Sequence, residues 1–332
     1  MRIAVDAMGG DFAPRNIVEG AIEALRDTGN RFEVILVGQK PAIELILGPD
    51  RPKGLAYRIV HAPEVIDMHD EAMAAVRQKK DSSIAVGVTL HRNGEADAFV
   101  SAGHTGAVMS ASTLILGRIE GVGRPTIGTL FPTEKGFCLL FDAGANVDCK
   151  PQHLYEFATM GSIYAREMLS IPNPRVGLVS IGEESTKGDA ATVEAHRLLS
   201  AGSLNFIGNI EGRDILKGKA DVVVCDGFVG NVILKFAESV AGYFKTKFRD
   251  YAGKNIFRKL WVGMMVGTMR SVMKNFDYQQ YGGVPLLGVN GVSIIGHGKS
   301  SPLAVKNMIL KAEEMAGKNI NRNIHEALAA AK

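Results

Sequence analysis

The first 37 residues, MRIAVDAMGGDFAPRNIVEGAIEALRDTGNRFEVILV, alternate strand-like and helix-like patterns. Arg2–Asp6 and Phe32–Val37 are short apolar runs, and Pro14–Arg26 between them has the apolar spacing of a helix. Continuous runs of Val, Ile and Leu, in place of strict alternation, are typical of strands that are buried on both faces. The order strand, helix, strand therefore predicts an α/β fold.

The same rhythm continues through residue 226. Further apolar runs predict strands at Tyr57–Ala62, Ala96–Ser101, Thr126–Phe131, Phe137–Asp142, Val176–Ile181 and Val222–Asp226. Helix-like spacing predicts helices at Pro41–Leu47, Glu71–Lys79, Ser83–Arg92, Gly106–Leu116, Gln152–Met168 and Ala190–Leu199. Because helices alternate with buried strands, we expect a doubly wound, mostly parallel sheet in an α/β/α arrangement.

The segment after the last of these strands has a different pattern, with two long helical stretches at Val229–Ala252 and Asn255–Asn275. Gly253 separates them, which predicts a helical hairpin that projects from the sheet. A glycine-rich strand-like segment and a final helix follow. Since there is no internal repeat or low-complexity linker, we expect a single α/β domain over residues 1–332, with the hairpin inserted at about 229–276.

The composition of the 332 residues, 46% hydrophobic and 22% charged, is that of a soluble globular protein. The three cysteines form no C-x-x-C pair, which favours a reducing cytoplasm and argues against disulfides or a cysteine zinc site. The first residues contain no signal-type apolar stretch, so we expect no secretion. Two uncharged runs, Ala98–Gly117 and Tyr278–Gly298, contain turn residues and are expected to be buried segments, not membrane spans.

Positive charge is concentrated in one part of the chain. Residues 245–274 contain eight Lys or Arg residues and one acid, Asp250, whereas the formal net charge of the whole chain is +3. Such a local cluster suits an anionic lipid surface or an acidic protein. Nucleic-acid binding is not favoured, because the segment contains no recognised binding module.

Six glycine-rich polar clusters lie at junctions between predicted strands and helices. They are Asp6–Asp11, Ser101–Gly106, Asp142–Asn146, Gly182–Gly188, Asp226–Asn231 and Gly296–Ser301. In open α/β sheets, ligands bind at the carboxyl ends of strands, where backbone N–H groups and helix dipoles favour anions. Together the clusters predict a deep polar crevice that holds an anionic ligand.

Two nucleotide-binding motifs are incomplete or missing. Gly298-Lys299-Ser300 resembles the end of a phosphate loop, but Ser293 stands at the place of the first glycine, so an NTPase is not expected. No G-x-G-x-x-G follows the first strand, which argues against a nicotinamide cofactor.

His104 and His297 lie inside glycine-rich clusters and are candidates to line the crevice, whereas no histidine spacing indicates a metal site.

Eight motifs occur in order along nearly the whole chain. They are Val5-Asp-Ala-Met-Gly-Gly-Asp11, Ser101-Ala-Gly-His-Thr-Gly-Ala107, Asp142-Ala-Gly-Ala-Asn146, Ile181-Gly-Glu-Glu184, Gly208-Asn-Ile-Glu-Gly-Arg-Asp214, Asp226-Gly-Phe-Val-Gly-Asn231, Tyr281-Gly-Gly-Val-Pro-Leu-Leu-Gly-Val-Asn290 and His297-Gly-Lys-Ser300. This set resembles the PlsX family, the phosphate acyltransferases that begin bacterial phospholipid synthesis. The resemblance implies a fold similar to that of the isocitrate and isopropylmalate dehydrogenases, which the phosphotransacetylases share.

The resemblance also implies a function. A fatty-acyl group would pass from acyl carrier protein to inorganic phosphate, giving an acyl phosphate and free carrier protein, with no cofactor. The family further implies a homodimer in the cytoplasm, in peripheral contact with the anionic inner face of the cell membrane. A membrane glycerol-3-phosphate acyltransferase is the expected downstream partner.

For this reaction, phosphate itself is the nucleophile, so the protein has to position it, stabilise the oxyanion and assist thiolate departure. The expected catalytic residues are Lys187, His297 and Asp226. The expected phosphate-binding or acyl-binding residues are Asp6, Gly9, Gly10, Asp11, Gly103, His104, Thr105, Gly106, Asn146, Asn231 and Lys299. The aspartates in these lists also suit turn capping without a catalytic role.

The predicted hairpin has an apolar tip with basic flanks. Its expected membrane or carrier-protein contacts are Phe257, Arg258, Lys259, Leu260, Trp261, Met264 and Met265. Trp and Met beside Lys and Arg suit an anionic membrane interface, and the same charges suit the acidic carrier protein. A core or dimer-interface role fits the same spacing.

Two other functions remain open on the sequence alone. An NAD-dependent decarboxylating dehydrogenase of the related fold would need a metal-binding acidic cluster and a cofactor site, and neither pattern is present. A non-enzymatic, membrane-associated scaffold would use the basic helices but leaves the six glycine-rich clusters unexplained.

Overall fold

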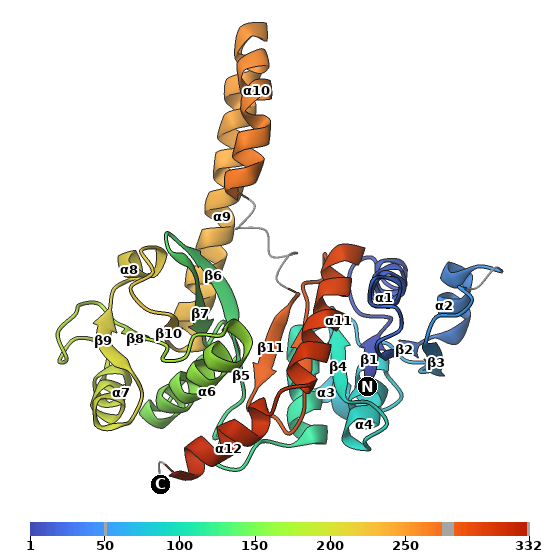
Figure 1. Ribbon diagram of the computed structural model, residues 1–332, viewed down its shortest axis with the longest axis horizontal. Coiled ribbons are helices and arrows are strands. Elements are labelled where there is room, and N and C mark those ends of the chain that lie inside the picture. The colour runs from blue at the N-terminus through green and yellow to red at the C-terminus, as the bar shows by residue number, and fades with distance from the viewer. Residues whose placement is uncertain (50–51, 274–281, 331–332) are drawn as a thin grey trace.

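The strands are divided between two sheets, where the sequence predicted one (Figure 1). The computed structural model describes residues 1–49, 52–273 and 282–330. The seven-stranded sheet has the order β3 (Tyr57–His61), β2 (Glu33–Gly38), β1 (Arg2–Asp6), β4 (Ala98–Ser101), β12 (Ser293–Ile295), β11 (Val284–Leu287) and β5 (Thr126–Ile127). The five-stranded sheet has the order β6 (Thr129–Thr133), β7 (Gly136–Phe141), β10 (Val222–Val224), β8 (Val176–Val179) and β9 (Phe206–Ile210).

Most neighbouring strands are parallel, so the predicted α/β class is confirmed. In the seven-stranded sheet, β11 is antiparallel to both β12 and β5, and the other pairs are parallel. In the five-stranded sheet, β6 is antiparallel to β7, and the other pairs are parallel. Every residue of β4 and β10 is buried, which accounts for the continuous apolar runs that marked these strands in the sequence.

The separation into two sheets occurs at Gly128. The segment predicted as one strand, Thr126–Phe131, is two strands, β5 and β6, which belong to different sheets. A Cβ atom at Gly128 would lie 1.9 Å from a ring carbon of Phe141 on β7. The backbone therefore passes this buried ring because residue 128 has no side chain.

Helices cover both sheets. Beside the seven-stranded sheet lie α1 (Arg15–Thr28), α2 (Lys40–Leu47), α3 (Ala72–Gln78), α4 (Ser83–Arg92), α5 (Thr105–Ala111), its π-helical continuation η1 (Ser112–Leu116) and α11 (Pro302–Ala316). Beside the five-stranded sheet lie α6 (Pro151–Leu169), α7 (Ala190–Ala201) and α8 (Gly212–Leu216), and α12 (Ile320–Ala330) packs against α6. One buried cluster includes Val5, Leu287 and Phe141, so the hydrophobic core is continuous between the sheets.

Two long helices extend away from the sheets (Figure 1). α9 (Gly227–Ala252) begins at the carboxyl end of β10, and α10 (Ile256–Met273) packs alongside it. The predicted end of the second helix at Asn275, and residues 278–281 of the uncharged run Tyr278–Gly298, lie outside the described residues. Within the described part of the chain, no helix has the length and apolar character needed to cross a membrane.

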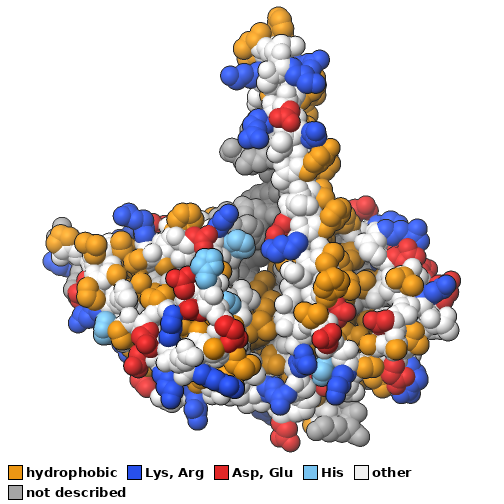
Figure 2. Space-filling view, turned by 180° about the vertical axis from the view of Figure 1, so that it is seen from behind, with side chains coloured by type: hydrophobic (Ala, Val, Ile, Leu, Met, Phe, Trp, Pro, Cys, Tyr) orange, Lys and Arg blue, Asp and Glu red, His pale blue; other side chains and the backbone are white. Residues whose placement is uncertain are grey.

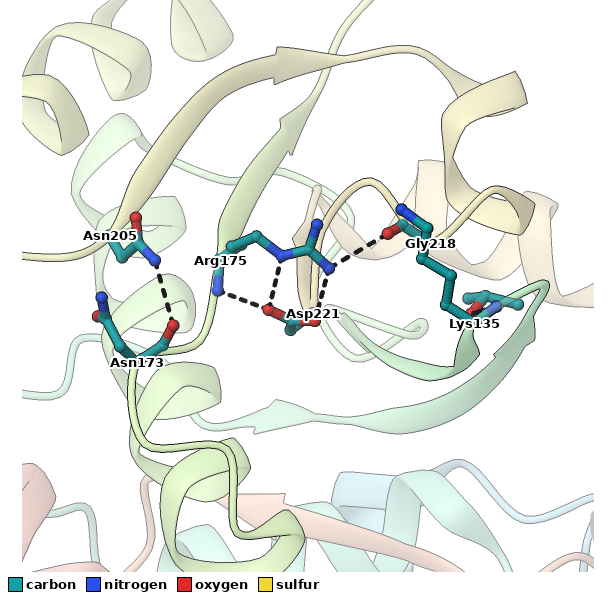
Figure 3. Close-up of polar contacts among 7 residues, drawn as sticks. Lys135, Asn173, Arg175, Asn205, Gly218 and Asp221 are labelled. Carbon is teal, nitrogen blue, oxygen red and sulfur yellow. Dashed lines mark hydrogen bonds and ion pairs between the residues drawn. The ribbon is translucent and has the colours of Figure 1, made fainter.

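A charged cluster ties together the amino ends of two strands of the five-stranded sheet (Figure 3). The Arg175 guanidinium donates to both carboxylate oxygens of Asp221, over 3.0 Å from Nε and 2.9 Å from Nη2, and to the Gly218 carbonyl oxygen over 3.2 Å. These residues directly precede β8 and β10. The cluster therefore braces the edge opposite to the one where ligands bind in such sheets.

Candidate active site

A cavity of about 510 Å³ lies between the two sheets, where their parallel strands end. Its polar and glycine residues are Asp11, Gly103, Thr105, Thr129, Gly144, Asn231, Lys235, Glu238, Gly283, Gly296, His297 and Gly298. Its apolar residues are Met68, Ile127, Leu130, Phe131, Pro132, Ala143, Leu234, Ala237, Val284 and Ile295. A cavity therefore lies where the polar crevice was predicted, but much of its lining is apolar, which the glycine-rich motifs did not indicate.

Three loops of the seven-stranded sheet meet at the cavity, those that follow β1, β4 and β12. The Asp11 N–H donates to the Gly298 carbonyl oxygen over 2.7 Å. A Cβ atom at Gly9 would lie 2.7 Å from the Gly103 nitrogen, and one at Gly10, where φ is 110°, would lie 3.0 Å from the Gly298 oxygen. Because Gly9 and Gly10 have no side chains, the loops can touch. Gly9 and Gly10 themselves lie outside the lining of the cavity, whereas Asp11 and Gly103 belong to it.

Asp6 lies beneath these loops and outside the lining. Its buried carboxylate accepts hydrogen bonds from Ser101 Oγ (2.7 Å) and the Met8 N–H (3.1 Å). Burial raises the pKa of Asp6, and the hydrogen bonds oppose that rise. Ser101 Oγ in turn accepts the Gly103 N–H over 3.0 Å, so this N–H is already used inside the protein. Asp6 therefore holds the loops in place.

The start of α5 contributes Thr105 to the lining. His104 Nδ1 accepts the Ala107 N–H over 3.2 Å, so the imidazole caps the helix and lies outside the lining. Gly106 is outside the lining as well. The backbone N–H groups of Thr105 and Gly106 have no acceptor within the residues that the structure describes, which leaves them available to a ligand beside Thr105.

The loop after β7 forms the facing wall, and its polar side chains point into the protein. The Asp142 carboxylate accepts from the Ala145 N–H (3.0 Å), the Asn146 N–H (2.6 Å) and Asn146 Nδ2 (2.8 Å). Burial raises the pKa of Asp142. Asn146 Nδ2 also donates to the Pro125 carbonyl oxygen over 2.8 Å. Asn146 thus stabilises the loop and lies outside the lining.

α9 is seated on this loop through close backbone contact. A Cβ atom at Gly230 would lie 1.9 Å from the Asp142 carbonyl oxygen. Asn231, the next residue, lines the cavity beside Gly144, where an added Cβ would lie 3.3 Å from the Asn231 Cβ. The Asp226 carboxylate accepts the Val229 N–H over 2.7 Å, so Asp226 caps α9 and is not part of the lining.

Lys187, which was predicted to be catalytic, and Lys299, which was predicted to bind phosphate or the acyl group, also lie outside the lining. Lys187 is exposed on the loop between β8 and α7, and its carbonyl oxygen accepts from Ser180 Oγ over 2.8 Å. Lys299 is exposed, and its N–H donates to His297 Nδ1 over 3.1 Å. Of the three predicted catalytic residues, the structure brings one, His297, to the cavity.

Sequence analysis missed the walls that α9 and β6 provide. Asn231, Leu234, Lys235 and Glu238 follow the spacing i, i+3, i+4, i+7, which places them on one face of the helix. This signal is present in the sequence once Asn231 is assigned to the site. The contribution of Phe131 has no such signal, because it depends on the separation of the sheets.

The cysteines are unsuited to nucleophilic catalysis. Cys138 and Cys225 are buried and Cys149 is half-buried, and none forms a disulfide. Burial raises the pKa of Cys138 to about 12 and that of Cys149 to about 11, so these thiols remain protonated at neutral pH. Among the described residues, no three His, Cys, Asp or Glu side chains are grouped to hold a metal ion.

The fold of this chain is similar to that of solved phosphotransacylases. A phosphotransacetylase from Streptococcus pyogenes is similar with a TM-score of 0.61 and 18% identity, over 95% of this chain and 94% of that one. A 4-hydroxythreonine-4-phosphate dehydrogenase from Klebsiella pneumoniae is similar with a TM-score of 0.55 and 13% identity, over 96% of this chain and 98% of that one. At these identities the similarity concerns the fold alone. The protein is thus in the class of α/β proteins with the phosphotransacylase fold.

Sequence similarity defines the group more narrowly. Residues 1–323 match the family described as fatty acid synthesis protein, and the chain belongs to this family. A phosphate acyltransferase from Pelotomaculum thermopropionicum is 49% identical over 328 residues, which are 99% of this chain and 95% of that relative. One from Chlorobaculum parvum is 47% identical over 338 residues, with 99% of each chain covered. The resemblance inferred from the eight motifs is confirmed.

Proposed function

We propose that this protein is a phosphate acyltransferase that uses acyl carrier protein as the acyl donor. An oxygen of inorganic phosphate attacks the thioester carbonyl carbon, a tetrahedral oxyanion forms, and the carbon–sulfur bond breaks. The departing thiolate takes up one proton, which balances the proton that the attacking hydrogen phosphate loses, so the products are an acyl phosphate and the carrier-protein thiol. The names of the relatives and of the family support this activity.

The observation that carries the proposal is the division of the cavity into polar and apolar surfaces. Leu130, Phe131, Leu234 and Ala237 supply an apolar wall suited to a hydrocarbon chain. The loop after β4, the loop after β12 and the start of α9 supply the hydrogen-bonding side chains of Thr105, His297 and Asn231, which suit phosphate and the thioester oxygen. A fatty-acyl thioester beside phosphate has the same division between an apolar chain and a polar reacting end.

Residue roles follow from which groups reach the cavity. We assign proton donation to the departing thiolate to His297, and hydrogen bonding to phosphate or the oxyanion to Thr105 and Asn231. Asp6 and Asp226 act through the loop and helix that they hold in place. Direct phosphate contact by Lys187 or Lys299 has no support from the lining, which includes neither.

The decisive experiment follows thiol release from acyl-acyl-carrier-protein with and without inorganic phosphate. The proposal expects release that depends strictly on phosphate, with acyl phosphate among the products. Release without phosphate would identify a thioesterase, and no release by folded protein from intact substrate would also contradict the proposal. The dehydrogenase and scaffold alternatives have no support, since the close relatives are phosphate acyltransferases and the dehydrogenase similarity concerns the fold alone.

For α9 and α10 we propose a helical hairpin that contacts the anionic membrane surface or acyl carrier protein. Figure 2 shows apolar side chains at the end of this pair, with Lys and Arg below them. Phe257 and Met264 are 79% and 76% exposed, Leu260 and Trp261 are exposed as well, and Arg258 lies 4.8 Å from the centre of the Tyr251 ring. An exposed apolar and basic surface of this kind suits an interfacial anchor.

Sedimentation with anionic vesicles tests this anchor. A Trp261→Asp, Met264→Asp double variant should lose most vesicle binding while keeping activity on soluble substrate. Unchanged binding would refute lipid contact, and weaker activity without weaker binding would favour carrier-protein docking. The anchor would place the enzyme at the cytoplasmic membrane face, where a membrane glycerol-3-phosphate acyltransferase would use the product.

We further propose a homodimer, because α9 exposes an apolar row at Phe228, Val232 and Phe236 with a spacing of four residues.

The continuous core between the sheets favours a single α/β domain over residues 1–332 with the hairpin at about 229–276. Similarity to the dehydrogenase fold supports the predicted relation to the isocitrate and isopropylmalate dehydrogenases.

A further inference from the structure

The charged side chains of the cavity are unevenly divided between acids and bases. Asp11 and Glu238 are the carboxylates of the lining, and Lys235 is its one Lys or Arg within the described part of the chain. Inorganic phosphate and an acyl phosphate are both anions at neutral pH. If Lys235 were removed, the carboxylates of Asp11 and Glu238 would remain in the lining, and both repel such a ligand.

The orientation of α9 about its own axis places Lys235 near the polar loops. It lies one helical turn after Asn231, and residues four apart on a helix have Cβ atoms about 5–6 Å from each other. Asn231 lies beside Gly144 of the loop after β7, since a Cβ added at Gly144 would be 3.3 Å from the Asn231 Cβ, and both residues line the cavity. The flexible four-carbon stem of a lysine is long enough to carry its ammonium group across one turn toward that loop.

The ammonium group of Lys235 is held by a weak partner. Its Nζ lies 2.9 Å from Glu238 Oε2, and the two side chains are 57% and 45% exposed. Exposed ion pairs of this kind contribute little to stability, because water and salt screen them. A doubly charged phosphate can therefore replace the Glu238 carboxylate at little cost.

We propose that Lys235 is the phosphate-binding cation of the active site and that Glu238 holds it in place when the site is empty. The inference rests on the proposed acyl transfer and adds the residue that recognises the phosphoryl group of both the attacking phosphate and the acyl phosphate product. Lys235 contacts the phosphoryl oxygens and transfers no proton. Its loss should therefore weaken phosphate binding more than it slows the reaction of bound substrates.

The test compares the KM for phosphate, the KM for acyl-acyl-carrier-protein and kcat in three variants. Lys235→Met should raise the KM for phosphate roughly tenfold or more, since a charge-assisted contact is lost. Lys235→Arg should restore much of that loss. Arg197→Met is the matched control, because Arg197 forms an i, i+3 ion pair with Glu194 on α7, with 67% and 45% exposure, away from the cavity.

Two outcomes separate this inference from the proposed function. If the wild-type enzyme needs phosphate and Lys235→Met keeps the wild-type KM for phosphate, Lys235 has no binding role and the inference fails alone. If the wild-type enzyme shows no phosphate-dependent transfer, the proposed function fails. Calorimetric titration with inorganic phosphate, on protein checked for folding by circular dichroism, should show the same roughly tenfold loss of affinity for Lys235→Met without any turnover.

The Glu238→Gln variant tests the second part of the inference. Removing the carboxylate frees Lys235 and removes a negative charge that faces the ligand, so the KM for phosphate should fall below the wild-type value. A KM that rises would show that Glu238 assists phosphate binding and would overturn its assignment as the partner displaced by phosphate.

Discussion

The two walls of the cavity use their polar residues in opposite ways. On the side of the seven-stranded sheet, the carboxylate of Asp6 is buried and hydrogen-bonded to neighbouring loops. On the side of α9, Lys235 and Glu238 are half-exposed, and the structure pairs them with each other. The comparison shows that Asp6 maintains the shape of the first wall from beneath, while Asp11, Thr105 and His297 of that wall line the cavity, and that Lys235 and Glu238 on the second wall line it as an exposed ion pair.

The largest expected effect comes from disturbing the contact between the walls. Gly230→Ala would force a Cβ to within 1.9 Å of the Asp142 carbonyl oxygen, so α9 must shift. We expect a loss of about 3 kcal/mol or more of unfolding free energy, together with a large loss of activity.

Gly242→Ala on the same helix is the control for this prediction. Among the described residues, an added Cβ there meets nothing within 4 Å, and alanine favours helix by about 1 kcal/mol over glycine, so stability should rise slightly. Chemical denaturation measures both variants. Equal effects of the two substitutions would contradict the seating of α9 on the loop after β7.

A second effect depends on pH and concerns Lys311 of α11, which donates to the carbonyl oxygen of cavity residue Gly283 over 2.9 Å. Burial lowers the pKa of Lys311 from 10.5 to about 8. Between these values the unfolded chain binds the proton and the folded chain does not, so this group makes folding more favourable as pH rises. The full change corresponds to about 3 kcal/mol.

The difference in unfolding free energy between wild type and Lys311→Met isolates the contribution of Lys311 to the pH dependence of stability, since the other groups titrate in both proteins. It should change in favour of the wild type from pH 8 to pH 10.5. A difference that is constant across this range would show that the Lys311 ammonium is solvated in the folded protein.

A third prediction concerns stability and compares the carboxylate of Asp6, which lies beneath the loops, with that of Asp11, which lies in the lining. Asp6→Ala leaves the Ser101 hydroxyl and the Met8 N–H without their acceptor, which should cost about 2 kcal/mol of stability. Asp11→Ala removes an exposed carboxylate and should change stability by less than about 0.5 kcal/mol. Thermal unfolding of the two variants tests the distinction, and a similar loss in both would contradict it.

The smallest effect concerns the choice of acyl chain. Ala237 lies in the apolar wall and packs against the cluster that contains Phe131, so Ala237→Leu should shorten the space for the chain. We expect kcat/KM for long acyl chains to fall roughly tenfold relative to short ones. Ser239→Leu, on the same helix outside the lining, should leave the ratio unchanged. An unchanged ratio in Ala237→Leu would place the acyl chain elsewhere.

Much of the fold was predictable because its signals are local. Buried strands such as β4 and β10 have continuous apolar runs, and the serine or aspartate caps of α4, α7 and α11 mark helix starts. The separation at Gly128 was not predictable, because it depends on the ring of Phe141, which reaches this position only in the folded protein.

The candidate site was predictable as a set of loops and not as a set of side chains. Strand ends lie together at one edge of a sheet, so five of the six glycine-rich clusters contribute residues to the cavity, whereas Gly182–Gly188 contributes none. Whether a polar side chain in such a loop faces the cavity depends on its partners. Asn146 donates to Pro125 inside the protein, while Asn231 lines the cavity.

The sequence by itself determined the alternation of strands and helices, the polar loops that follow them and the membership of the family, since these depend on local periodicity and ordered motifs. The tertiary structure alone decided that the strands form two sheets, that Lys187 lies outside the cavity and that Lys235 lies within it. The physical reason is that the order of strands and the rotation of α9 arise from packing between distant segments. Helical spacing places Lys235 on the same face as Asn231, but that packing decides which face of α9 lines the cavity.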